Sequence, residues 1–324
     1  MNKKYLTAMS GSYLAIDLGG TKCAGAIISD EGKIRIQKKI RIAGLAGDDA
    51  GDAMIKLCAE LLDHPGLKDV ECKGIGISVP GISYKERGTV WAPNIPGWED
   101  YPLRDKIQHS LRDSLPVSIE NDRACSIMGE YWLGAARGCK NAIHLAFGTG
   151  IGAGIIADGR VLRGQSDIAG SVGWLALDDQ YPEGYRQYGC FEYNASGDGL
   201  SRLANDLYRS DKRYHNSMLQ PGKMDAAEIF EAWEQNDTLA LEVMKTAIQY
   251  WGKGVANLVS IFNPEIIIFG GGLFGPALQF LKDIYQEATK YAQPIAIKEV
   301  ALCPGVLGAE TQLFGAVKIR MNEL

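Results

Sequence analysis

Long apolar runs are missing from this sequence of 324 residues. No segment has the roughly 20 consecutive apolar residues that a membrane-spanning helix needs. The dozen residues before the first apolar strand, MNKKYLTAMSGS, also lack the hydrophobic core of a signal peptide. We therefore expect a cytoplasmic protein that does not bind a membrane.

Long basic runs and paired cysteines are missing as well. The net charge is -5, which argues against a nucleic-acid partner. The seven cysteines are odd in number and scattered without a C-x-x-C, as is typical of reduced thiols in the cytosol. The four histidines have no metal-ligand spacing, and we interpret them as structural or surface residues: His64, His109, His144 and His215.

Short β-rich runs alternate with helical patterns along the chain. Hairpins followed by strand-helix alternation occur twice, which predicts an α/β protein of two lobes with a cleft between them. Strands are predicted at residues 13–18, 24–29, 33–42, 73–79, 116–120, 142–147, 152–157, 265–269 and 295–302. Helices are predicted at residues 49–64, 101–114, 121–134 and 238–262.

A weak internal repeat supports two related lobes. Residues 19–28 (GGTKCAGAII) align without a gap with residues 148–157 (GTGIGAGIIA), with four identities in ten positions. Both segments follow the first strand of a strand-rich region. We interpret the chain as two related lobes that face each other.

The two aligned turns are suited to binding a polyphosphate. Glycines let backbone N–H groups approach an anion without a Cβ in the way. Asp17 would repel the phosphates unless a hard cation such as Mg²⁺ lay between them. The first turn contains Gly19, Gly20, Thr21 and Lys22, and the second contains Gly148, Thr149 and Gly150.

Ordinary tight β-turns are the alternative interpretation of these segments. A dinucleotide fold is disfavoured, because Ala153 stands where the third glycine of G-x-G-x-x-G belongs and another hairpin follows. No G-x-x-x-x-G-K-[ST] occurs. A third cluster, Gly270, Gly271 and Gly272, follows a buried strand, where a flat ring or a phosphate can lie against bare backbone, although it also suits a simple strand-helix connection.

Eight motifs in order make the chain resemble the ROK family of sugar kinases and repressors, which has the two-lobed actin- and hexokinase-like ATPase fold with ribonuclease H-like repeats. The resemblance is nearly full length and implies a lobe at residues 1–121, completed by a helix at 308–324, and a second lobe at 122–307. The motifs are DLGGTK (17–22), VPGI (79–82), APNIPGW (92–98), ENDRACSIMGE (120–130), LAFGTGIGAGII (145–156), GCFE (189–192), IIIFGGG (266–272) and GAETQLFGA (308–316).

The resemblance implies an ATP site made by the three glycine segments, and Asp122 as the catalytic base. A carboxylate that accepts the hydroxyl proton suits phosphoryl transfer. Capping of the following helix by Asn121 or Asp122 is the alternative, and the two roles are compatible. Asn94 and Asn121 offer amides for sugar hydroxyls, and Gly81 lets the backbone approach the ring.

The chain departs from the family pattern at the metal segment. Glu183 and Tyr185 stand at two of the family's cysteine positions, and Trp174 stands at the histidine position. Cys190 alone cannot hold a tetrahedral Zn²⁺, so we predict that zinc is absent.

The expected sugar site changes too. Ser171 replaces a glutamate and Trp174 replaces an imidazole, whereas Glu192 is retained. Trp174 would either cover the apolar face of a sugar ring or fill the space left by the metal.

Three functions are compatible with these features. The leading hypothesis is an ATP- and Mg²⁺-dependent kinase that phosphorylates a hydroxyl, the 6-hydroxyl in our interpretation, of a hexose or N-acetylhexosamine. A sugar-responsive repressor would need a DNA-reading helix-turn-helix ahead of Tyr13, for which twelve residues are too few. A catalytically silent sensor of sugar or nucleotide is the third hypothesis. By resemblance we also expect a homodimer.

Overall fold

The computed structural model describes residues 11–67, 70–111, 115–222 and 224–323. The N-terminal residues 1–10, the end of the helix predicted at 101–114 and residue 324 lie outside this set. Contacts divide the chain into two compact units. Unit 1 consists of residues 1–137, 163–169 and 307–324, and unit 2 of residues 138–162 and 170–306.

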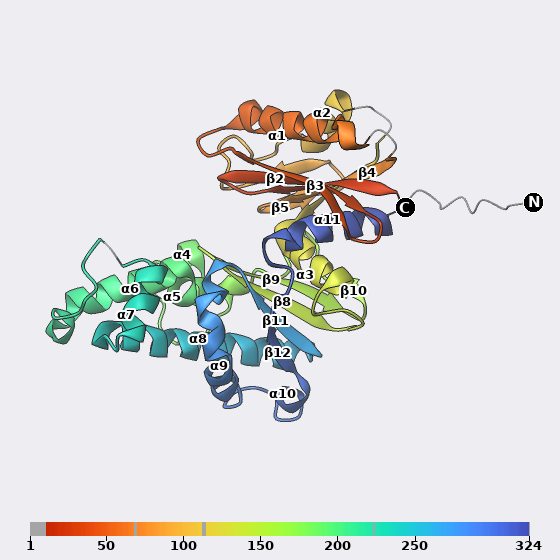
Figure 1. Ribbon diagram of the computed structural model, residues 1–324. Coiled ribbons are helices and arrows are strands. Elements are labelled where there is room, and N and C mark those ends of the chain that lie inside the picture. The colour runs from red at the N-terminus through yellow and green to blue at the C-terminus, as the bar shows by residue number, and fades with distance from the viewer. Residues whose placement is uncertain (1–10, 68–69, 112–114, 223, 324) are drawn as a thin grey trace, which may run out of the picture. The chain divides into compact units, whose positions relative to one another are not determined.

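Unit 1 is built on a five-stranded sheet with helices on both faces (Figure 1). Its elements are β1 (Ser12–Leu18), β2 (Lys22–Ser29), β3 (Ile34–Arg41), α1 (Gly47–Leu62), β4 (Cys72–Val79), β5 (Ile82–Tyr84), β6 (Thr89–Trp91), α2 (Leu103–Ser110), β7 (Val117–Asn121), α3 (Asp122–Leu133) and α11 (Thr311–Asn322). The strand order is β3-β2-β1-β4-β7, in which β1 to β3 are antiparallel and β4 and β7 run parallel to β1.

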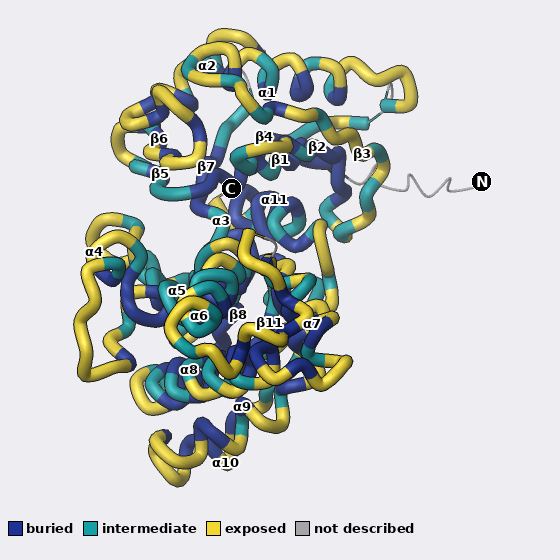
Figure 2. Tube along the Cα trace, turned by 90° about the vertical axis from the view of Figure 1, so that its left-hand side faces the viewer, coloured by how far each residue is buried: buried dark blue, intermediate teal, exposed yellow. Residues whose placement is uncertain are grey.

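Alternation along the strands of unit 1 fills both faces of the sheet. In β1, Leu14 and Ile16 belong to the core shared with α1, whereas Tyr13 and Ala15 belong to the core shared with α11. Edge strand β3 is largely exposed, whereas β1 and β4 are buried (Figure 2). The predicted packing of the C-terminal helix on the first lobe is confirmed, because α11 contacts β1, β4 and α3.

Unit 2 repeats the sheet of unit 1. Its elements are β8 (Ala142–Phe147), β9 (Ile151–Ala157), β10 (Arg160–Val161), α4 (Tyr185–Tyr188), α5 (Cys190–Ala195), α6 (Gly197–Ser210), α7 (Ala226–Glu234), α8 (Thr238–Phe262), β11 (Ile266–Gly270), α9 (Leu281–Ala288), α10 (Ala296–Glu299) and β12 (Ala301–Pro304). The strand order β10-β9-β8-β11-β12 matches that of unit 1, with two antiparallel and two parallel pairings. The repeated α/β architecture expected from the aligned turns is therefore confirmed.

The core of unit 2 lies between its sheet and its helices, with α8 fully embedded. Trp251 of α8 and Phe147 of β8 are fully buried with ring centroids 6.1 Å apart. Burying each such side chain stabilises the fold by about 1.5 to 3 kcal/mol. Helix α8 begins where Asp237 accepts hydrogen bonds from the N–H groups of Leu239 and Ala240, and ends at Asn263, whose φ of 45° is left-handed.

One predicted strand is wrong. Residues 296–299 of the strand expected at 295–302 form helix α10, and β12 begins only at Ala301. Gln293 explains the difference, because its Oε1 accepts hydrogen bonds from the backbone N–H groups of Ile295 (2.8 Å) and Ala296 (2.7 Å). A side chain that satisfies the first donors of a turn favours a helix over a strand.

The boundary expected between residues 121 and 122 also differs from the observed division. Helix α3 groups with unit 1, because it packs closely against α11. Across residues 11–67, 70–111, 115–222 and 224–323, no helix combines the length and the apolar character that crossing a membrane would require.

Candidate active site

Asp17 lies in the middle of a row of residues that crosses the sheet of unit 1. Its neighbours are Ala24 on β2 and Ser78 on β4, and Ser78 in turn lies opposite Glu120 on β7. On the other side, Ala24 lies opposite Lys39 of β3. The parallel strands β1, β4 and β7 thus place Asp17, Ser78 and Glu120 near their carboxyl ends, where open α/β sheets bind their ligands.

Two carboxylates interact at this end of the sheet. Burial raises the pKa of Asp17 to about 6, and the negative charge of Asp122 contributes to the increase. Burial also raises the pKa of Asp122, and the positive charge of Arg123 partly offsets it. Two neighbouring acids with raised pKa values are typical of a site that handles protons or cations.

Replacing Asp17 by Asn should stabilise the ligand-free protein by about 2 to 3 kcal/mol at pH 7.5. The unfolded Asp17 ionises near pH 3.9, whereas the folded residue keeps its proton up to about pH 6. The wild type therefore loses stability as the pH rises from about 4 to about 6, and the variant does not. Urea unfolding at pH 4 and 7.5 measures the difference. Equal effects at both pH values would contradict the burial of this charge.

The DLGGTK segment forms a tight turn between β1 and β2. The N–H of Gly19 donates to the carbonyl of Lys22 at 2.9 Å. A Cβ on Gly20 would lie 2.9 Å from the Cβ of Asn94, so bare backbone is required where these two segments meet. Thr21 and Lys22 are exposed. Unit 1 therefore brings a predicted phosphate turn and a predicted sugar-binding amide into contact.

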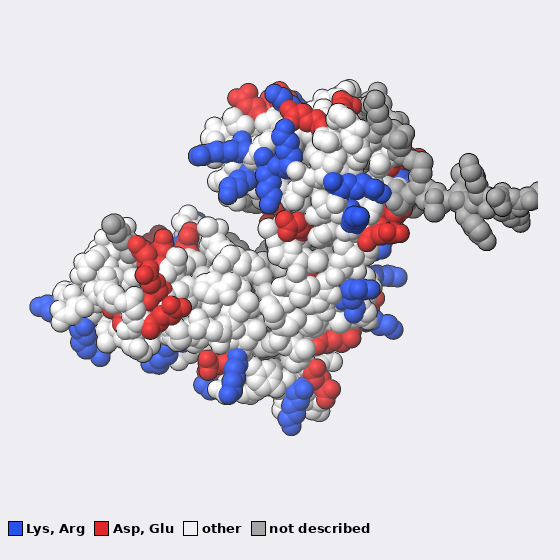
Figure 3. Space-filling model, in the orientation of Figure 1, with Lys and Arg blue, Asp and Glu red and all other residues white. Residues whose placement is uncertain are grey.

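Cations surround the β1–β2 turn on the surface of unit 1. Lys22 lies opposite Arg41 in the β2–β3 register, and Lys39 precedes Arg41 by two residues on the same face. Figure 3 shows Lys and Arg side chains gathered over β2 and β3. Our sequence analysis missed Lys39 and Arg41, because only strand pairing shows that they share a face with Asp17.

Gly81 occupies a position that only glycine fits. Its φ is 95°, and a Cβ would lie 2.2 Å from the carbonyl oxygen of Trp91. Asn94 is exposed in the turn between Ala92, whose N–H donates to the carbonyl of Trp98, and the buried Trp98 itself. The turn is therefore fixed by its backbone and by the core, which leaves Asn94 on its surface.

Asn121 caps α3 and so leaves Asp122 as the first helical residue. Its Oδ1 accepts from the N–H of Ala124 at 2.9 Å. Its Nδ2 donates to Glu120 Oε1 at 3.1 Å. These bonds engage the amide oxygen and one of the two amide hydrogens, so Asn121 acts mainly on its own helix.

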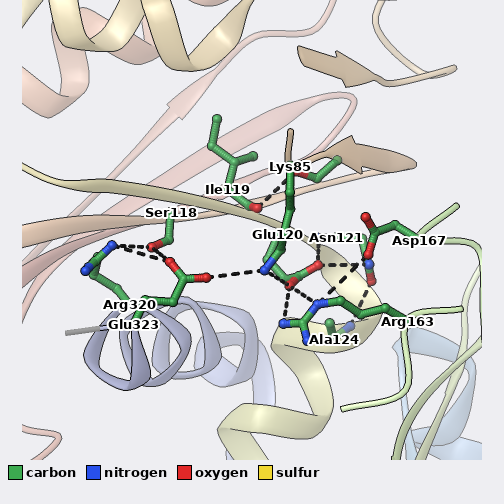
Figure 4. A network of polar contacts seen from close by, with 11 residues as sticks. Lys85, Ser118, Ile119, Glu120, Asn121, Ala124, Arg163, Asp167, Arg320 and Glu323 are labelled. Carbon is green, nitrogen blue, oxygen red and sulfur yellow. Dashed lines mark hydrogen bonds and ion pairs between the residues drawn. The ribbon is translucent and has the colours of Figure 1, made fainter. Parts of the chain in front are cut away.

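A buried ion-pair network around Glu120 was missed by our sequence analysis. The Glu120 side chain is 1% exposed, and its Oε2 lies 2.6 Å from Arg163 Nη2 and 3.2 Å from Lys85 Nζ (Figure 4). Arg163 is 43 residues away in sequence and belongs to the short segment 163–169 of unit 1. No local pattern marks such a pair.

In unit 2, the turn between β8 and β9 is bound by Glu192. The N–H of Gly148 donates to the carbonyl of Gly150 at 2.9 Å. Glu192 Oε2 accepts from the N–H of Ile151 at 2.8 Å and would lie 2.7 Å from a Cβ on Gly150. Glu192, predicted as a sugar ligand, thus has one carboxylate oxygen engaged by the turn. Burial raises its pKa.

A cavity of about 550 Å³ opens beside this turn. Helix α6 is joined to the turn, because the N–H of Gly197 donates to the carbonyl of Gly148 at 2.8 Å. The cavity thus brings together two of the predicted glycine segments, and its volume suits a nucleotide-sized molecule. It is lined by Gly148, Thr149, Gly197, Asp198, Ser201, Asp225, Ala226, Ala227, Phe230, Gly272, Leu273 and Pro276.

The three glycines after β11 differ in their surroundings. Gly271 has a φ of 84°, and a Cβ there would lie 2.1 Å from the carbonyl oxygen of Phe147. A Cβ on Gly270 would meet His144 Nε2 at 2.5 Å, whereas Gly272 faces open space in the cavity. Close packing therefore explains Gly270 and Gly271, and access to the cavity explains Gly272.

Ser171 and Trp174 lie at the ends of a short 3₁₀ helix in unit 2. Ser171 precedes that helix, Val172–Trp174. Trp174 is 57% exposed, so it does not fill a space left by a metal. Covering the face of a ligand remains the role that its exposure favours.

The former metal segment is held by other bonds. Cys190 is buried and its Sγ accepts from the N–H of Leu177, Tyr185 is buried, and Glu183 is exposed. Among the residues that the structure describes, no three His, Cys, Asp or Glu side chains are grouped to hold a metal ion. The absence of zinc stays a prediction.

His144 is buried in β8, as a structural histidine would be. Burial lowers its pKa to about 4, and its Nδ1 makes no hydrogen bond. His64 Nδ1 accepts from the N–H of Gly66, and His215 packs against the ring of Tyr208.

Comparison with known proteins identifies the family. The sequence model of the ROK family matches residues 13–322. A glucokinase of Halalkalibacterium halodurans is 32% identical over 94% of this chain and 93% of that protein. A glucokinase of Thermotoga maritima is 31% identical over 91% of this chain and 95% of that protein.

A solved structure agrees with these relatives. The ROK family glucokinase from Streptomyces griseus, crystallised with glucose and AMPPNP, has a TM-score of 0.73 and 27% identity over 95% of this chain and 99% of that chain. The expected two-lobed sugar kinase fold is thus confirmed. This chain belongs to the ROK family.

Proposed function

We propose that this protein is an ATP-dependent sugar kinase that transfers the γ-phosphoryl group of ATP to the 6-hydroxyl of a hexose or N-acetylhexosamine. The glucokinases of two bacteria, each similar over more than nine-tenths of this chain, support a sugar substrate. The observation that carries the proposal is the buried Asp122 at the start of α3, next to a second acid, Asp17.

Asp122 is the proposed base. Its carboxylate would accept the proton of the sugar hydroxyl as that oxygen attacks the γ-phosphorus and ADP leaves. Its raised pKa strengthens it as a proton acceptor at neutral pH, since a carboxylate with an ordinary pKa is a weaker base. Asn121 holds the helix end, so the base stands on a rigid element.

We propose that the nucleotide occupies the cavity of unit 2. The cavity combines the 148–149 turn with the starts of α6 and α7, and its volume of about 550 Å³ suits a nucleoside. The Gly19–Lys22 turn and the Lys39 and Arg41 side chains of unit 1 would serve the phosphates.

Mg²⁺ fits the acid pair of unit 1. Asp17 and Asp122 repel each other, and a hard cation next to Asp17 would relieve that repulsion. When bound, the ion would neutralise charge on the phosphates. Asp17 is the residue that we propose to hold it, through the nucleotide.

Filling the cavity should weaken ATP binding. Replacing Ala227 by Trp places a large ring among the cavity-lining residues, and we expect KM for ATP to rise about tenfold or more, as loss of one strong contact region would produce. Replacing Glu231 by Trp on the exposed side of the same helix is the matched control. An unchanged KM for ATP in the first variant would place the nucleotide elsewhere.

For the sugar, we propose a set of polar residues from both units. Gly81 and Asn94 come from unit 1 with Asn121 and Asp122, and Ser171, Trp174 and Glu192 come from unit 2. The exposed Trp174 ring would lie against the apolar face of a sugar. Ser171, a short hydroxyl side chain, leaves room for a substituent such as an N-acetyl group.

The deciding experiment is a coupled assay of ADP release across hexoses, amino sugars and N-acetylated sugars. Sugar-dependent turnover is the expected result. Sugar or nucleotide binding without turnover would instead favour the catalytically silent sensor. Metal analysis of the purified protein tests the predicted absence of zinc, and light scattering tests the homodimer that the family resemblance leads us to propose.

A further inference from the structure

Glu120 contacts the residue that caps the catalytic helix. It lies on β7 immediately before Asn121 and is 1% exposed. Its Oε1 accepts two hydrogen bonds from Asn121, one from the backbone N–H and one from Nδ2, both at 3.1 Å. The orientation of the Asn121 amide, and with it the cap on Ala124, therefore depends on this carboxylate.

The other oxygen of Glu120 is held by two cations. Arg163 donates to Oε2 from Nε at 2.9 Å and from Nη2 at 2.6 Å, and Lys85 Nζ lies 3.2 Å away (Figure 4). A buried carboxylate needs such partners, because an unpaired charge in the interior is strongly destabilising. Arg163, with its forked donors, fixes the carboxylate in direction as well as in charge.

These bonds form a continuous chain to the base. Arg163 orients Glu120, Glu120 orients Asn121, and Asn121 caps α3, whose first residue is Asp122. A displacement of about 1 Å at a reacting group can cost on the order of a hundredfold in rate. The position of Asp122 is thus tied to a side chain 41 residues further along the chain.

We propose that Glu120 and Arg163 are positioning residues for the Asp122 base. Neither needs to touch the substrate, because they act through the Asn121 amide and the start of α3. The inference rests on the proposed kinase function, and it adds two residues to the machinery of that reaction.

The matched control lies at the other end of the same helix. Glu130 is also fully buried, and its carboxylate accepts from the backbone N–H groups of Ala135 (2.8 Å) and Leu307 (3.4 Å). Glu130→Gln therefore tests the loss of a buried charge on α3 without touching the cap.

The experiment compares steady-state kinetics of Glu120→Gln, Arg163→Met, Arg163→Lys and Glu130→Gln. We expect kcat to fall about 10- to 100-fold in Glu120→Gln and about tenfold in Arg163→Met, with KM for ATP within about twofold. Arg163→Lys should recover most of the loss, because it restores the charge. Glu130→Gln should keep the wild-type kcat and lose only stability. Wild-type kcat in Glu120→Gln, or an equal loss in Glu130→Gln, would overturn the inference.

A second measurement does not depend on activity. The N–H of Ala124 is the group that Asn121 caps, so its hydrogen exchange should become about tenfold faster in Glu120→Gln, while exchange at Leu145 of unit 2 stays unchanged. Unchanged exchange at Ala124 would refute the positioning chain. If the wild type turned over no sugar, the proposed function would fail, whereas the exchange data would still decide whether Glu120 holds the cap.

Discussion

Replacing Asp122 by Asn should lower kcat for sugar phosphorylation by about 10²- to 10⁴-fold. The amide cannot accept the hydroxyl proton, and it nearly preserves the shape of the carboxylate. Helix α3 should persist, since Asn121 and not Asp122 provides the cap. The variant should also be more stable than the wild type at neutral pH, because a charge that burial disfavours is removed. Coupled ADP release and urea unfolding measure the two effects.

The matched control is Asp105→Asn, which changes an exposed acid in the first turn of α2. It should leave kcat unchanged. The pH profile of kcat/KM gives an independent reading. The wild type should lose activity as the pH falls through the raised pKa values of Asp122 and of Asp17, the latter about 6, since the base must be ionised. A kcat within threefold of the wild type in Asp122→Asn would mean that another group accepts the proton.

Replacing Gly315 by Ala should destabilise unit 1 by about 3 kcal/mol, at the upper end of the usual cost of overpacking. A Cβ at this position of α11 would lie 1.7 Å from the carbonyl oxygen of Cys125 in α3. Gly129 of α3 meets the carbonyl oxygen of Thr311 in the same way, at 2.2 Å. The two helices therefore touch backbone to backbone, and an added methyl group must push them apart.

Urea unfolding followed by circular dichroism measures this effect. The control is Gly275→Ala, whose Cβ would have no neighbour closer than 3.8 Å and whose φ of -85° suits any residue. It should be within about 1 kcal/mol of the wild type. Similar unfolding curves for both variants would show that α3 and α11 separate easily. A loss of activity in Gly315→Ala would follow as well, because α3 bears Asp122.

Local sequence signals predicted much of the fold. The bounds of α8 agree with the prediction, because a capping Asp237 and a left-handed Asn263 mark its ends in sequence. The hairpins at the two glycine turns were predicted for a similar reason, since an apolar strand, a turn and another strand are adjacent in the chain. The helices between residues 185 and 234 were not predicted, because they are short and irregularly patterned.

Only part of the candidate site could be predicted. The glycine turns, Asp122 and its capping neighbour have recognisable neighbours in sequence. The cavity of unit 2 was not foreseen as a whole, because the starts of α6 and α7 line it from a region that has no motif. Glu192 was expected to face a sugar, and one of its oxygens instead accepts from the backbone of a turn 41 residues earlier.

The amino-acid sequence by itself determined where the chain turns, where its long helices begin and end, and which acids and glycines are available for phosphate chemistry. These are properties of residues close together in the chain. Only the tertiary structure decided which of them meet. Strand pairing put Asp17, Ser78 and Glu120 in one row, and burial raised the pKa of Asp17 to about 6. Pairing and burial depend on segments far apart in sequence, and no local pattern encodes them.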